Sequence, residues 1–408
     1  MISNLQKINE ISEAKKIFEI LNHNENETVC LFVGGCVRDL LSNKDLKDID
    51  LATTLLPNEV KKKLSNENLE YDDKFENYGS IKCFLNKKSF EINTLRSDFD
   101  HDGRQAKVSF AKDWKQDALR RDFTFNAIYS DLQGRIYDPF NGAEDLASGI
   151  VKFIGDPVTK INEDYLRVLR YFRFFIQFSK VGHDEYILRH IDKNLHNIES
   201  LSKDRLLDEL KKILLTGKAY KLFDNFFSKD LYLSIYRGIK YLTRLEFDRK
   251  KRKIHKEIDW VVLLSLVLID QTRNFERFVK DFNIPNQAKK RLDNLQKQFT
   301  FKTTDTIDSI ENLRKKTHKH GSQSVMDFIH FQYLVNERYK EDLYLENLSI
   351  IKKENPPKFS FDTQILLDKG FQANESLGKA LSFLEDRWLN NNFKISDEDI
   401  DDAIQLYK

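Results

Sequence analysis

The pattern of apolar and polar positions changes along the chain and predicts two kinds of structure. In the first third, short apolar or alternating runs are bounded by turn residues, which is typical of strands. The predicted strands are residues 29–33, 48–52, 80–85, 89–94 and 135–138. From residue 163 to about residue 350 the apolar positions recur with a helical period instead. The sequence therefore predicts an α+β fold, in which a small mixed sheet with helices precedes an all-helical remainder.

The segments before and between the predicted strands indicate helices, a turn and a loop. Residues 1–22 have apolar side chains at helical spacing, and residues 57–69 form a lysine-rich run that begins with proline, a residue favoured in the first helical turn. Residues 86–88 read as a hairpin turn between two strands. The polar segment 95–115 is interpreted as a surface loop with residues 102–104 at its tip.

Composition changes this picture only slightly. The 408 residues include 67 basic and 65 acidic side chains, so the net charge of +2 does not by itself indicate a nucleic-acid-binding protein. The longest apolar stretch, residues 260–269, is too short to cross a bilayer, and no signal peptide is apparent. The three cysteines lack zinc-ligand spacing and are expected to be buried thiols in a reducing compartment. We therefore expect a cytoplasmic protein without a membrane partner.

The most informative chemistry lies in residues 31–53, LFVGGCVRDLLSNKDLKDIDLAT. A buried strand ends at Gly34 and Gly35, and a helix is predicted to begin there; backbone N–H groups at such a turn can bind phosphate. Asp48 and Asp50 follow on the next strand, where residues two apart face the same side. Two carboxylates this close repel each other unless a cation lies between them, and Mg²⁺ favours such oxygen ligands. Carboxylates beside a phosphate site indicate phosphoryl or nucleotidyl transfer.

The ordered combination of GGCVRD and DIDLAT resembles the signature of the class II nucleotidyltransferases. That family comprises the bacterial and eukaryotic CCA-adding enzymes and the bacterial poly(A) polymerases. Either motif alone is more often a turn or a solvated loop, but the two in this order are far more specific. The resemblance implies a polymerase-β-like head, with Asp48 and Asp50 as catalytic metal ligands and with Gly34, Gly35 and Arg38 at the nucleotide phosphates.

A second block, RRDFTFNA at residues 120–127, resembles the family's ribose-handling motif. Adjacent arginines can pair with phosphates, and an aspartate can accept a hydrogen bond from a ribose hydroxyl. The resemblance places Arg121, Asp122 and Asn126 at the nucleotide. The alternative is a surface salt-bridge cluster at the start of a helix, with Asp122 and Thr124 as capping residues.

A third block, NEDYLRVLRYFRFFIQF at residues 162–178, resembles the motif with which the family reads the incoming base. Glu163, Asp164, Arg167 and Arg170 lie at helical spacing and are expected to share one helix face. An aspartate accepts from an exocyclic amine, and an arginine donates to ring acceptors. Taken alone, the segment favours an ordinary amphipathic helix that carries intrahelical ion pairs.

Two further family features are weaker in this sequence. Glu91, on the second strand of the predicted hairpin, lies where the family has its third carboxylate; the alternative is a glutamate on an edge strand facing water. The segment 95–115 resembles the family's flexible loop, which is thought to help switch nucleotide specificity, although a plain surface loop has the same composition.

The resemblance implies a complete function. Two Mg²⁺ ions at Asp48 and Asp50 activate the RNA 3′-hydroxyl and stabilise the leaving pyrophosphate, and C, C and A are added from CTP and ATP to tRNA without a nucleic-acid template. The implied domains are a catalytic head (1–140), a neck that recognises the base (141–220), a body (221–350) and a tRNA-binding tail (351–408).

Three alternatives remain open. A poly(A) polymerase of the same class has a similar head but usually a basic C-terminal extension, whereas this chain ends in the acidic segment FKISDEDIDDAIQLYK. An enzyme that adds only CC or only A is the second alternative, and an inactive RNA-binding module is the third. The sequence does not define the oligomeric state.

Basic clusters in the helical half are candidates for gripping RNA phosphates. They are residues 249–253, 289–291 and 314–316. Phosphate contacts carry no sequence information, which suits an enzyme that accepts many tRNAs. Any single cluster is also consistent with a solvated helix face whose charge is balanced by nearby acids.

Overall fold

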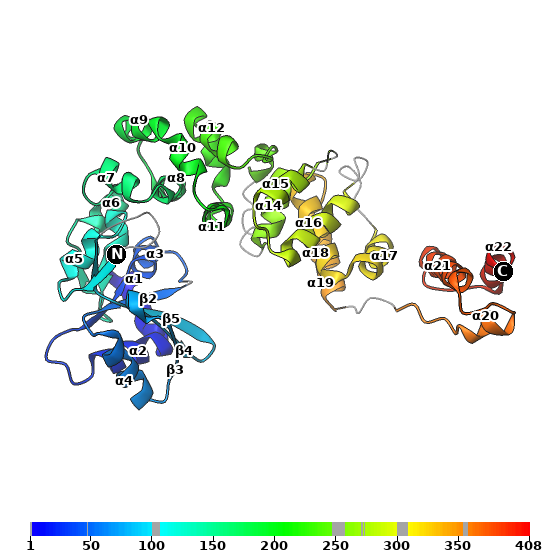
Figure 1. Ribbon diagram of the computed structural model, residues 1–408, viewed down its shortest axis with the longest axis horizontal. Helices are drawn as coiled ribbons and strands as arrows, with labels where there is room; N and C mark the ends of the chain where they lie inside the picture. Colours follow the sequence, from blue (N-terminus) through cyan, green and yellow to red (C-terminus); the bar gives the residue numbers. More distant parts are fainter. Residues whose placement is uncertain are drawn as a thin grey trace. The chain divides into compact units, whose positions relative to one another are not determined.

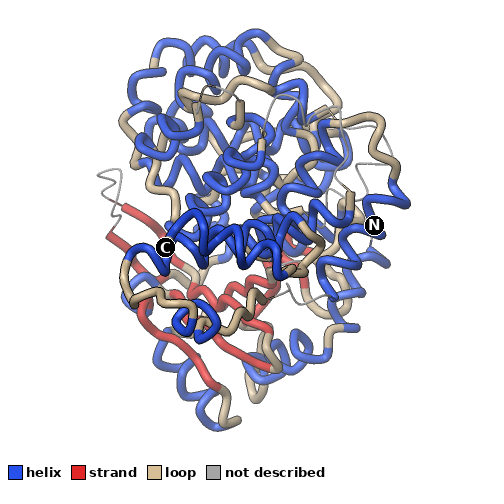
Figure 2. Tube along the Cα trace, turned by 90° about the vertical axis from the view of Figure 1, so that its right-hand side faces the viewer, coloured by secondary structure: helices blue, strands red, loops and turns tan. Residues whose placement is uncertain are grey.

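Strands and helices are segregated along the chain in the computed structural model. The structure describes residues 2–46, 48–99, 107–246, 258–270, 272, 274–299, 309–353 and 358–408. The chain divides into two compact units, Met1–Glu209 and Leu210–Lys408. All strands of the described residues lie before residue 140, in the blue and cyan part of Figure 1 and in red in Figure 2. The predicted α+β fold, with a helical remainder, is confirmed.

A mixed seven-stranded sheet forms the core of the first unit. Its strand order is β3-β4-β5-β2-β1-β8-β9. The strands are β1 (Cys30–Val33), β2 (Ile49–Thr53), β3 (Glu70–Phe75), β4 (Ser80–Leu85), β5 (Lys88–Thr94), β8 (Tyr129–Ser130) and β9 (Ile136–Tyr137). Only β2 and β5 pair in parallel; the other neighbouring strands of this sheet are antiparallel. The central strand is therefore β2, whose side chains are buried apart from Asp50, which is half-buried.

Helices surround this sheet in the first unit. Those before and within the sheet are α1 (Ile2–Leu5), η1 (Gln6–Glu10), α2 (Ser12–Asn22), α3 (Gly35–Leu41), α4 (Pro57–Asn66), η2 (Glu76–Tyr78), α5 (Trp114–Leu119) and η3 (Thr124–Asn126). Those after it are α6 (Gly142–Ser148), α7 (Pro157–Glu163), α8 (Leu166–Phe178), α9 (Glu185–Lys193) and α10 (Leu195–Glu199). Helix α11 (Lys203–Leu214) begins in the first unit and ends in the second. Helix α2 packs on α4 and on β1, so the helix predicted near the N-terminus covers the sheet, although η1 and Ile11 separate it from α1.

The five predicted strands are all present, each within one residue of its predicted ends. The predicted hairpin turn between β4 and β5 is also confirmed. Asn86 and Lys87 have positive φ angles of 50° and 65°, the conformation that a two-residue hairpin turn requires at both central positions.

Strand β3 was not predicted, and the helix expected over residues 57–69 is shorter than expected. Helix α4 ends at Asn66, and Asn68, with a φ of 54°, turns the chain into β3. The sequence of β3, EYDDKF, has no apolar alternation because none of its side chains is buried. A strand of this kind leaves no hydrophobic periodicity to detect.

The prediction of a plain loop over residues 95–115 is wrong for most of that segment. Its two ends form a two-stranded antiparallel sheet, β6 (Arg96–Phe99) with β7 (Lys107–Phe110), and α5 begins at Trp114. Four-residue strands rich in polar residues carry too little pattern to be distinguished from a loop. The predicted loop tip, residues 102–104, lies outside the described residues.

The second unit is helical throughout its described residues, as predicted. Its elements are η4 (Ala219–Phe223), α12 (Phe226–Ile235), η5 (Leu242–Leu245), α14 (Trp260–Leu268), α15 (Phe275–Asp281), α16 (Asn286–Gln298), α17 (Ile310–His320), α18 (Ser322–Val335), α19 (Glu341–Lys353), α20 (Gln364–Asp368), α21 (Glu375–Asn390) and α22 (Asp397–Tyr407). Helix α14 is the apolar stretch singled out in the sequence, and eight of its nine residues are buried. No helix within the described ranges is long and apolar enough to cross a membrane.

Candidate active site

Adjacent strands of the sheet bring the predicted carboxylates together. Asp50 on β2 lies directly opposite Glu91 on β5 in the parallel pairing, and Asp48 precedes β2 by one residue. Glu91 is exposed and accepts a hydrogen bond from Ser80 Oγ at 3.1 Å. Because β5 lies between β4 and β2, Glu91 is not on an edge strand. The alternative interpretation of Glu91 as an edge-strand residue is therefore wrong.

The electrostatics of Asp50 reflect this crowding of negative charge. Burial raises the pKa of Asp50, Glu91 and Asp48 raise it further, and Arg121 and Arg38 oppose them, which leaves a pKa of about 6. A divalent cation would relieve this repulsion, and carboxylate oxygens are ligands suited to Mg²⁺. No group of three His, Cys, Asp or Glu residues in the described part of the chain is arranged to hold a metal ion. The role of Asp48 and Asp50 as metal ligands therefore stays a prediction. The chemistry of the two carboxylates is compatible with it.

The Gly34-Gly35 turn lies beside two guanidinium groups. Gly34 has a φ of 73°, and a Cβ atom built on it would lie 3.4 Å from Arg121 Nη1. Glycine is therefore favoured there by the backbone conformation and by the close approach. Arg38, in α3, donates from Nη1 to Asn126 Oδ1 at 2.6 Å, and its side chain is only 11% exposed. Two of the predicted nucleotide-binding arginines thus flank the turn.

Asp117 holds the arginines of the second motif in place. Its carboxylate accepts from Arg120 Nε at 2.8 Å, from Arg121 Nη2 at 3.1 Å and from the Tyr129 hydroxyl at 2.8 Å. Burial alone would raise the pKa of Asp117, but the two arginines and Tyr129 reverse this effect and lower it. Asp117 was not predicted from the sequence. It lies three residues before Arg120 and four before Arg121, which are the spacings of ion pairs within a helix.

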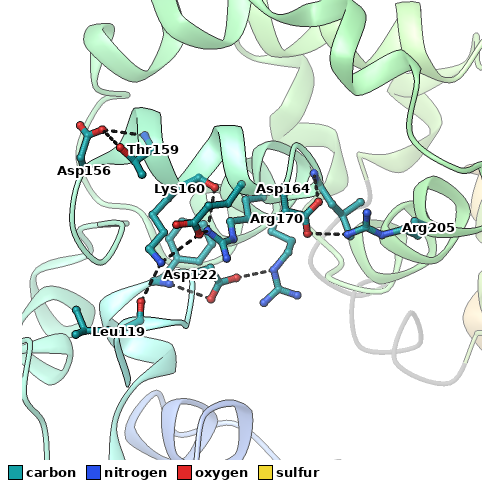
Figure 3. Close-up of polar contacts among 12 residues, drawn as sticks. Leu119, Asp122, Asp156, Thr159, Lys160, Asp164, Arg170 and Arg205 are labelled. Carbon is teal, nitrogen blue, oxygen red and sulfur yellow. Dashed lines mark hydrogen bonds and ion pairs between the residues drawn. The ribbon is translucent and has the colours of Figure 1, made fainter. Parts of the chain in front are cut away.

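Asp122 links the second motif to the third. Asp122 Oδ2 accepts from Arg170 Nε at 2.5 Å, and Oδ1 accepts from Asn126 Nδ2 at 2.9 Å; Figure 3 shows the Asp122 and Arg170 side chains pointing toward each other. Burial would raise the pKa of Asp122, but Arg170 and these hydrogen bonds lower it to about 2. Since Arg38 also bonds to Asn126, one continuous hydrogen-bonded network runs from α3 to α8. The alternative of a surface salt-bridge cluster is excluded because Asp122 is only 7% exposed.

The third motif is not one continuous helix, contrary to the prediction. Helix α7 ends at Glu163, Asp164 adopts an extended conformation with a φ of −159°, and α8 begins at Leu166. Asp164 Oδ1 accepts from the Leu166 N–H at 3.0 Å, which satisfies a backbone donor at the start of α8. The expectation that Asp164 and Arg167 share a helix face is therefore wrong, because Asp164 lies in the turn between two helices.

Ion pairs hold the two residues predicted to read the base; the partner Glu163 belongs to the predicted motif, whereas Arg205 was not predicted. Asp164 Oδ2 accepts from Arg205 Nη2 at 2.6 Å, and Arg167 Nη1 donates to Glu163 Oε2 at 2.5 Å. Arg205 comes from α11, and Figure 3 shows its side chain pointing toward Asp164. Lys160 in α7 also donates to Glu163. Arg205 lies 41 residues from Asp164, so no local spacing could have revealed the contact.

The strand pairing of carboxylates, the glycine turn and the flanking arginines define a nucleotidyltransferase head. The sequence profile of the family described as "Poly A polymerase head domain" matches residues 30–152. The profile described as "Probable RNA and SrmB- binding site of polymerase A" matches residues 184–242. Both matches agree with the class II nucleotidyltransferase resemblance.

Comparison with known proteins identifies the family more closely. The protein named CCA tRNA nucleotidyltransferase 1, mitochondrial, from Danio rerio is 30% identical over 390 residues, which cover 92% of this chain and 87% of that protein. The CCA-adding enzyme of Lactobacillus helveticus is 25% identical over 390 residues, covering 92% of each chain. The structure of Bacillus stearothermophilus CCA-adding enzyme in complex with CTP has the same fold, with a TM-score of 0.71 over 97% of both chains at 22% identity. This chain belongs to the CCA tRNA nucleotidyltransferase family.

Proposed function

We propose that this protein adds C, C and A to the 3′ end of tRNA, using CTP and ATP and no nucleic-acid template. The observation that carries the proposal is the pairing of Asp50 with Glu91 on adjacent parallel strands, next to the Gly34 turn and Arg121. Family membership over nine-tenths of the chain supports the substrate assignment, since the relatives are named for CCA addition.

Asp48 and Asp50 are proposed to hold Mg²⁺, with Glu91 as a third carboxylate. The two aspartates fit such an ion because carboxylate oxygens are ligands suited to Mg²⁺ and because burial and the charges of Glu91 and Asp48 raise the pKa of Asp50. The described carboxylates do not already form a three-ligand metal site, so Glu91 is proposed to join the group when the ion binds. When bound, Mg²⁺ would activate the RNA 3′-hydroxyl and stabilise the charge on the leaving pyrophosphate. The protein's own part is to hold the carboxylates on rigid strands, so that little reorganisation is needed when the reaction occurs.

The arginines beside the glycine turn are proposed to bind the nucleotide phosphates and sugar. The planar guanidinium groups of Arg38 and Arg121 can bind phosphate oxygens in pairs. Asp122 and Asn126 are proposed to act at the ribose together with Arg170, which the Asp122 carboxylate orients. A nucleotide held at several points in this way reaches the 3′-hydroxyl in one geometry.

Asp164 and Arg167 are proposed to read the base. Cytosine and adenine both present an amine donor beside a ring-nitrogen acceptor, so one carboxylate and one guanidinium can bind either base. Uracil and guanine present a carbonyl in place of that amine, which would face the carboxylate and be rejected. The ion pairs with Arg205 and Glu163 leave further lone pairs and N–H groups for the base and restrict both side chains.

We propose that the chain is divided into a head (1–140), a neck (141–220), a body (221–350) and a tail (351–408). The boundary between the two compact units falls at Glu209, close to the proposed end of the neck. We also propose that the helical body and tail bind tRNA and that the protein acts in the cytoplasm, although the Danio rerio relative is named mitochondrial.

One assay tests the function and its alternatives. The protein is incubated with Mg²⁺, labelled CTP or ATP, and tRNA transcripts that end at the discriminator base, in C or in CC, and the products are sized. A complete enzyme extends every transcript to CCA and then stops. A poly(A) polymerase would give long adenosine tails, a partial enzyme would stop after CC or need CC as its start, and an inactive RNA-binding module would give no product.

A further inference from the structure

Lys160 spans the distance between two parts of the proposed site. It lies in the last turn of α7, and its side chain is only 12% exposed, which is unusual for a lysine. Its Nζ donates to the Leu119 carbonyl oxygen at 2.9 Å, as Figure 3 shows, and to Glu163 Oε2 at 3.3 Å. Leu119 ends α5, directly before the arginines and aspartate of the ribose motif. One ammonium group thus ties the ribose side of the site to the base side.

Both anchors of Arg167 depend on the same turn of α7. Arg167 Nη1 donates to Glu163 Oε2 at 2.5 Å and to the backbone carbonyl oxygen of Lys160 at 2.9 Å. A single carboxylate oxygen of Glu163 therefore accepts from two cations, Lys160 and Arg167. Burial and the charge of Arg167 lower the pKa of Lys160, while Glu163 raises it. The three side chains form one unit in which two cations share one carboxylate, so a change at Lys160 is expected to shift the position of Glu163.

We propose that Lys160 is a positioning residue for nucleotide selection, which holds Arg167 in its base-reading orientation through Glu163. The inference rests on the proposed function, because it assumes that Arg167 reads the base. It adds a residue outside the motifs on which the family resemblance rests. Because the Lys160 ammonium group is engaged by Leu119 and Glu163, its effect is expected in the binding and choice of nucleotide rather than in the chemistry itself.

A purely structural role for Lys160 is the competing explanation, since its ammonium group also satisfies the last carbonyl of α5. Lys180 makes the same kind of contact with the end of another helix. Lys180 Nζ donates to the Ala147 carbonyl oxygen at 2.7 Å, near the end of α6. Lys180→Met therefore serves as a matched control for Lys160→Met, because each substitution removes one ammonium from one helix-end carbonyl and keeps most of the side-chain length.

The test measures incorporation of all four nucleotides into tRNA transcripts by wild type, Lys160→Met and Lys180→Met. For Lys160→Met we expect KM for CTP and ATP to rise and discrimination against UTP to fall, each about tenfold, because small misplacements of positioning groups have effects of this order. We expect kcat with saturating CTP to change much less. Lys180→Met should match wild type in every one of these measurements. Unchanged selectivity and KM in a folded Lys160→Met protein would overturn the inference.

A double variant tests whether Lys160 acts through Glu163. Glu163→Gln removes the charge that both cations share but leaves the bond from Lys160 to Leu119. If the two residues act as one unit, Lys160→Met/Glu163→Gln should lose no more selectivity than Glu163→Gln alone. Full additivity of the two losses would overturn the proposed route. If Lys160→Met does not fold, Glu163→Gln carries the test, and wild-type selectivity in that variant would also overturn the inference.

The failure of this inference is distinguishable from failure of the proposed function. Wild-type protein that adds no nucleotide to any transcript contradicts the function itself, before any variant is compared. Wild-type protein that builds CCA, beside a Lys160→Met variant that is indistinguishable from it, contradicts only the positioning role.

Discussion

The acidic residues of the site fall into two groups: those beside the arginines, and those on or next to strands β2 and β5. Asp117, Asp122 and Asp164 each have arginine partners within hydrogen-bonding distance, whereas Asp50 faces two other carboxylates and has a raised pKa. A carboxylate without its own cation inside a group of paired ones is the position where a ligand cation is most strongly favoured. We therefore expect Asp50 to be the most sensitive residue of the site.

Replacement of Asp50 by alanine should abolish incorporation but leave folding and tRNA binding nearly intact. The loss of a metal ligand costs several kcal/mol of transition-state stabilisation, so we expect activity below about 1% of wild type. Incorporation assays, thermal unfolding and tRNA binding are measured together. Asp72→Ala, which removes an acidic residue from β3 in the same sheet, is the control and should keep full activity. An Asp50→Ala protein with more than a few per cent of wild-type activity would exclude the metal-ligand assignment.

Asp164 should determine which bases are rejected. Asp164→Ala removes the acceptor for the amine of cytosine and adenine, so UTP and GTP should compete better, whereas Arg167→Ala should weaken CTP and ATP alike. A site built on a buried polar contact typically discriminates by at least about 100-fold, and most of that should be lost in Asp164→Ala. Competition assays with mixed nucleotides measure the effect. If both variants keep wild-type selectivity, these residues are only part of the scaffold.

The Asp122–Arg170 pair should make stability depend on pH. The pKa of Asp122 falls from its ordinary value of 3.8 to about 2 in the folded protein, so between these values the unfolded chain binds more protons. The stabilisation, about 2 kcal/mol, is complete above the unfolded value and is lost as the pH falls toward 2. Asp122→Asn should therefore lower the free energy of unfolding more at pH 7 than at pH 3. Urea unfolding at both pH values measures this, and parallel pH profiles for the two proteins would contradict it.

At the scale of elements, charged side chains also connect helices far from the site. Arg291 in α16 donates from Nε and Nη2 to Asp327 in α18, at 2.7 and 2.6 Å, and from Nη1 to Asp259 at 2.5 Å. The Asp327 side chain is only 1% exposed. Arg291 belongs to the basic cluster at residues 289–291, and its internal pairing removes it from the set of candidate phosphate-binding groups.

Loss of Arg291 should destabilise the helical unit strongly. Arg291→Met leaves the buried Asp327 carboxylate without its cation, which should lower the free energy of unfolding by about 3 to 5 kcal/mol. Lys297→Met is the control on the same helix, because its pair with Asp293 is 60% and 33% exposed, and it should cost less than about 1 kcal/mol. Chemical unfolding of the full chain measures both. Similar decreases in the free energy of unfolding of the two variants would show that the buried Arg291–Asp327 pair stabilises the protein no more than an exposed pair.

The elements that the sequence predicted well are those with a strong hydrophobic period or a specific turn. Strand β4 was located to the residue because its apolar side chains alternate, and the turn at Asn86 was recognised from its composition. Strand β3 and the hairpin of β6 and β7 were missed because their side chains carry no such alternation. The break at Asp164 was missed because helical spacing of charges continues across it, while only the backbone conformation separates α7 from α8.

The site residues follow the same division. Asp50, Arg121 and Asp122 were found from motifs whose members lie close together in the sequence. Lys160 and Arg205 were not, because their roles depend on contacts between α5 and α7 and between α7 and α11 that only the folded chain creates. Local pattern thus locates the groups that are proposed to touch a substrate, whereas the groups that orient them are set by tertiary packing.

At the scale of the whole molecule, a nearly neutral protein must hold a polyanion through local basic surface. Of the three candidate clusters, residues 249–253 lie outside the described residues, residues 314–316 on α17 are only partly exposed, and Arg291 in the remaining cluster is engaged internally. Lys289 and Lys290 are exposed on α16. These two lysines are therefore the clearest candidates on which the expectation of phosphate contacts can be tested.

Affinity for tRNA should depend steeply on salt. If about four to six phosphates are contacted, log K should fall against log salt with a slope of about that size. Lys289→Gln/Lys290→Gln should flatten the slope by about 2 and raise KM for tRNA, while KM for ATP stays the same. The control is Lys15→Gln/Lys16→Gln on α2, which neutralises an exposed pair in the other unit and should leave the slope unchanged. Affinity that barely responds to salt would mean that shape and stacking carry recognition.

The parallel pairing of β2 with β5 limits how the gene for this protein can change in length. Side chains of a strand alternate between faces, so a shift of one residue in this pairing would turn Asp50 into the core and bring Ile49 or Leu51 to its place. A single codon inserted between the start of β2 and Asp50 would therefore inactivate the enzyme without removing any functional residue. The connection from Asn86 to Lys87, on the far side of β5, carries no such restriction on the carboxylates. Changes in chain length should therefore be tolerated in the turn between β4 and β5 but not within β2, a contrast that substitutions alone would show less clearly.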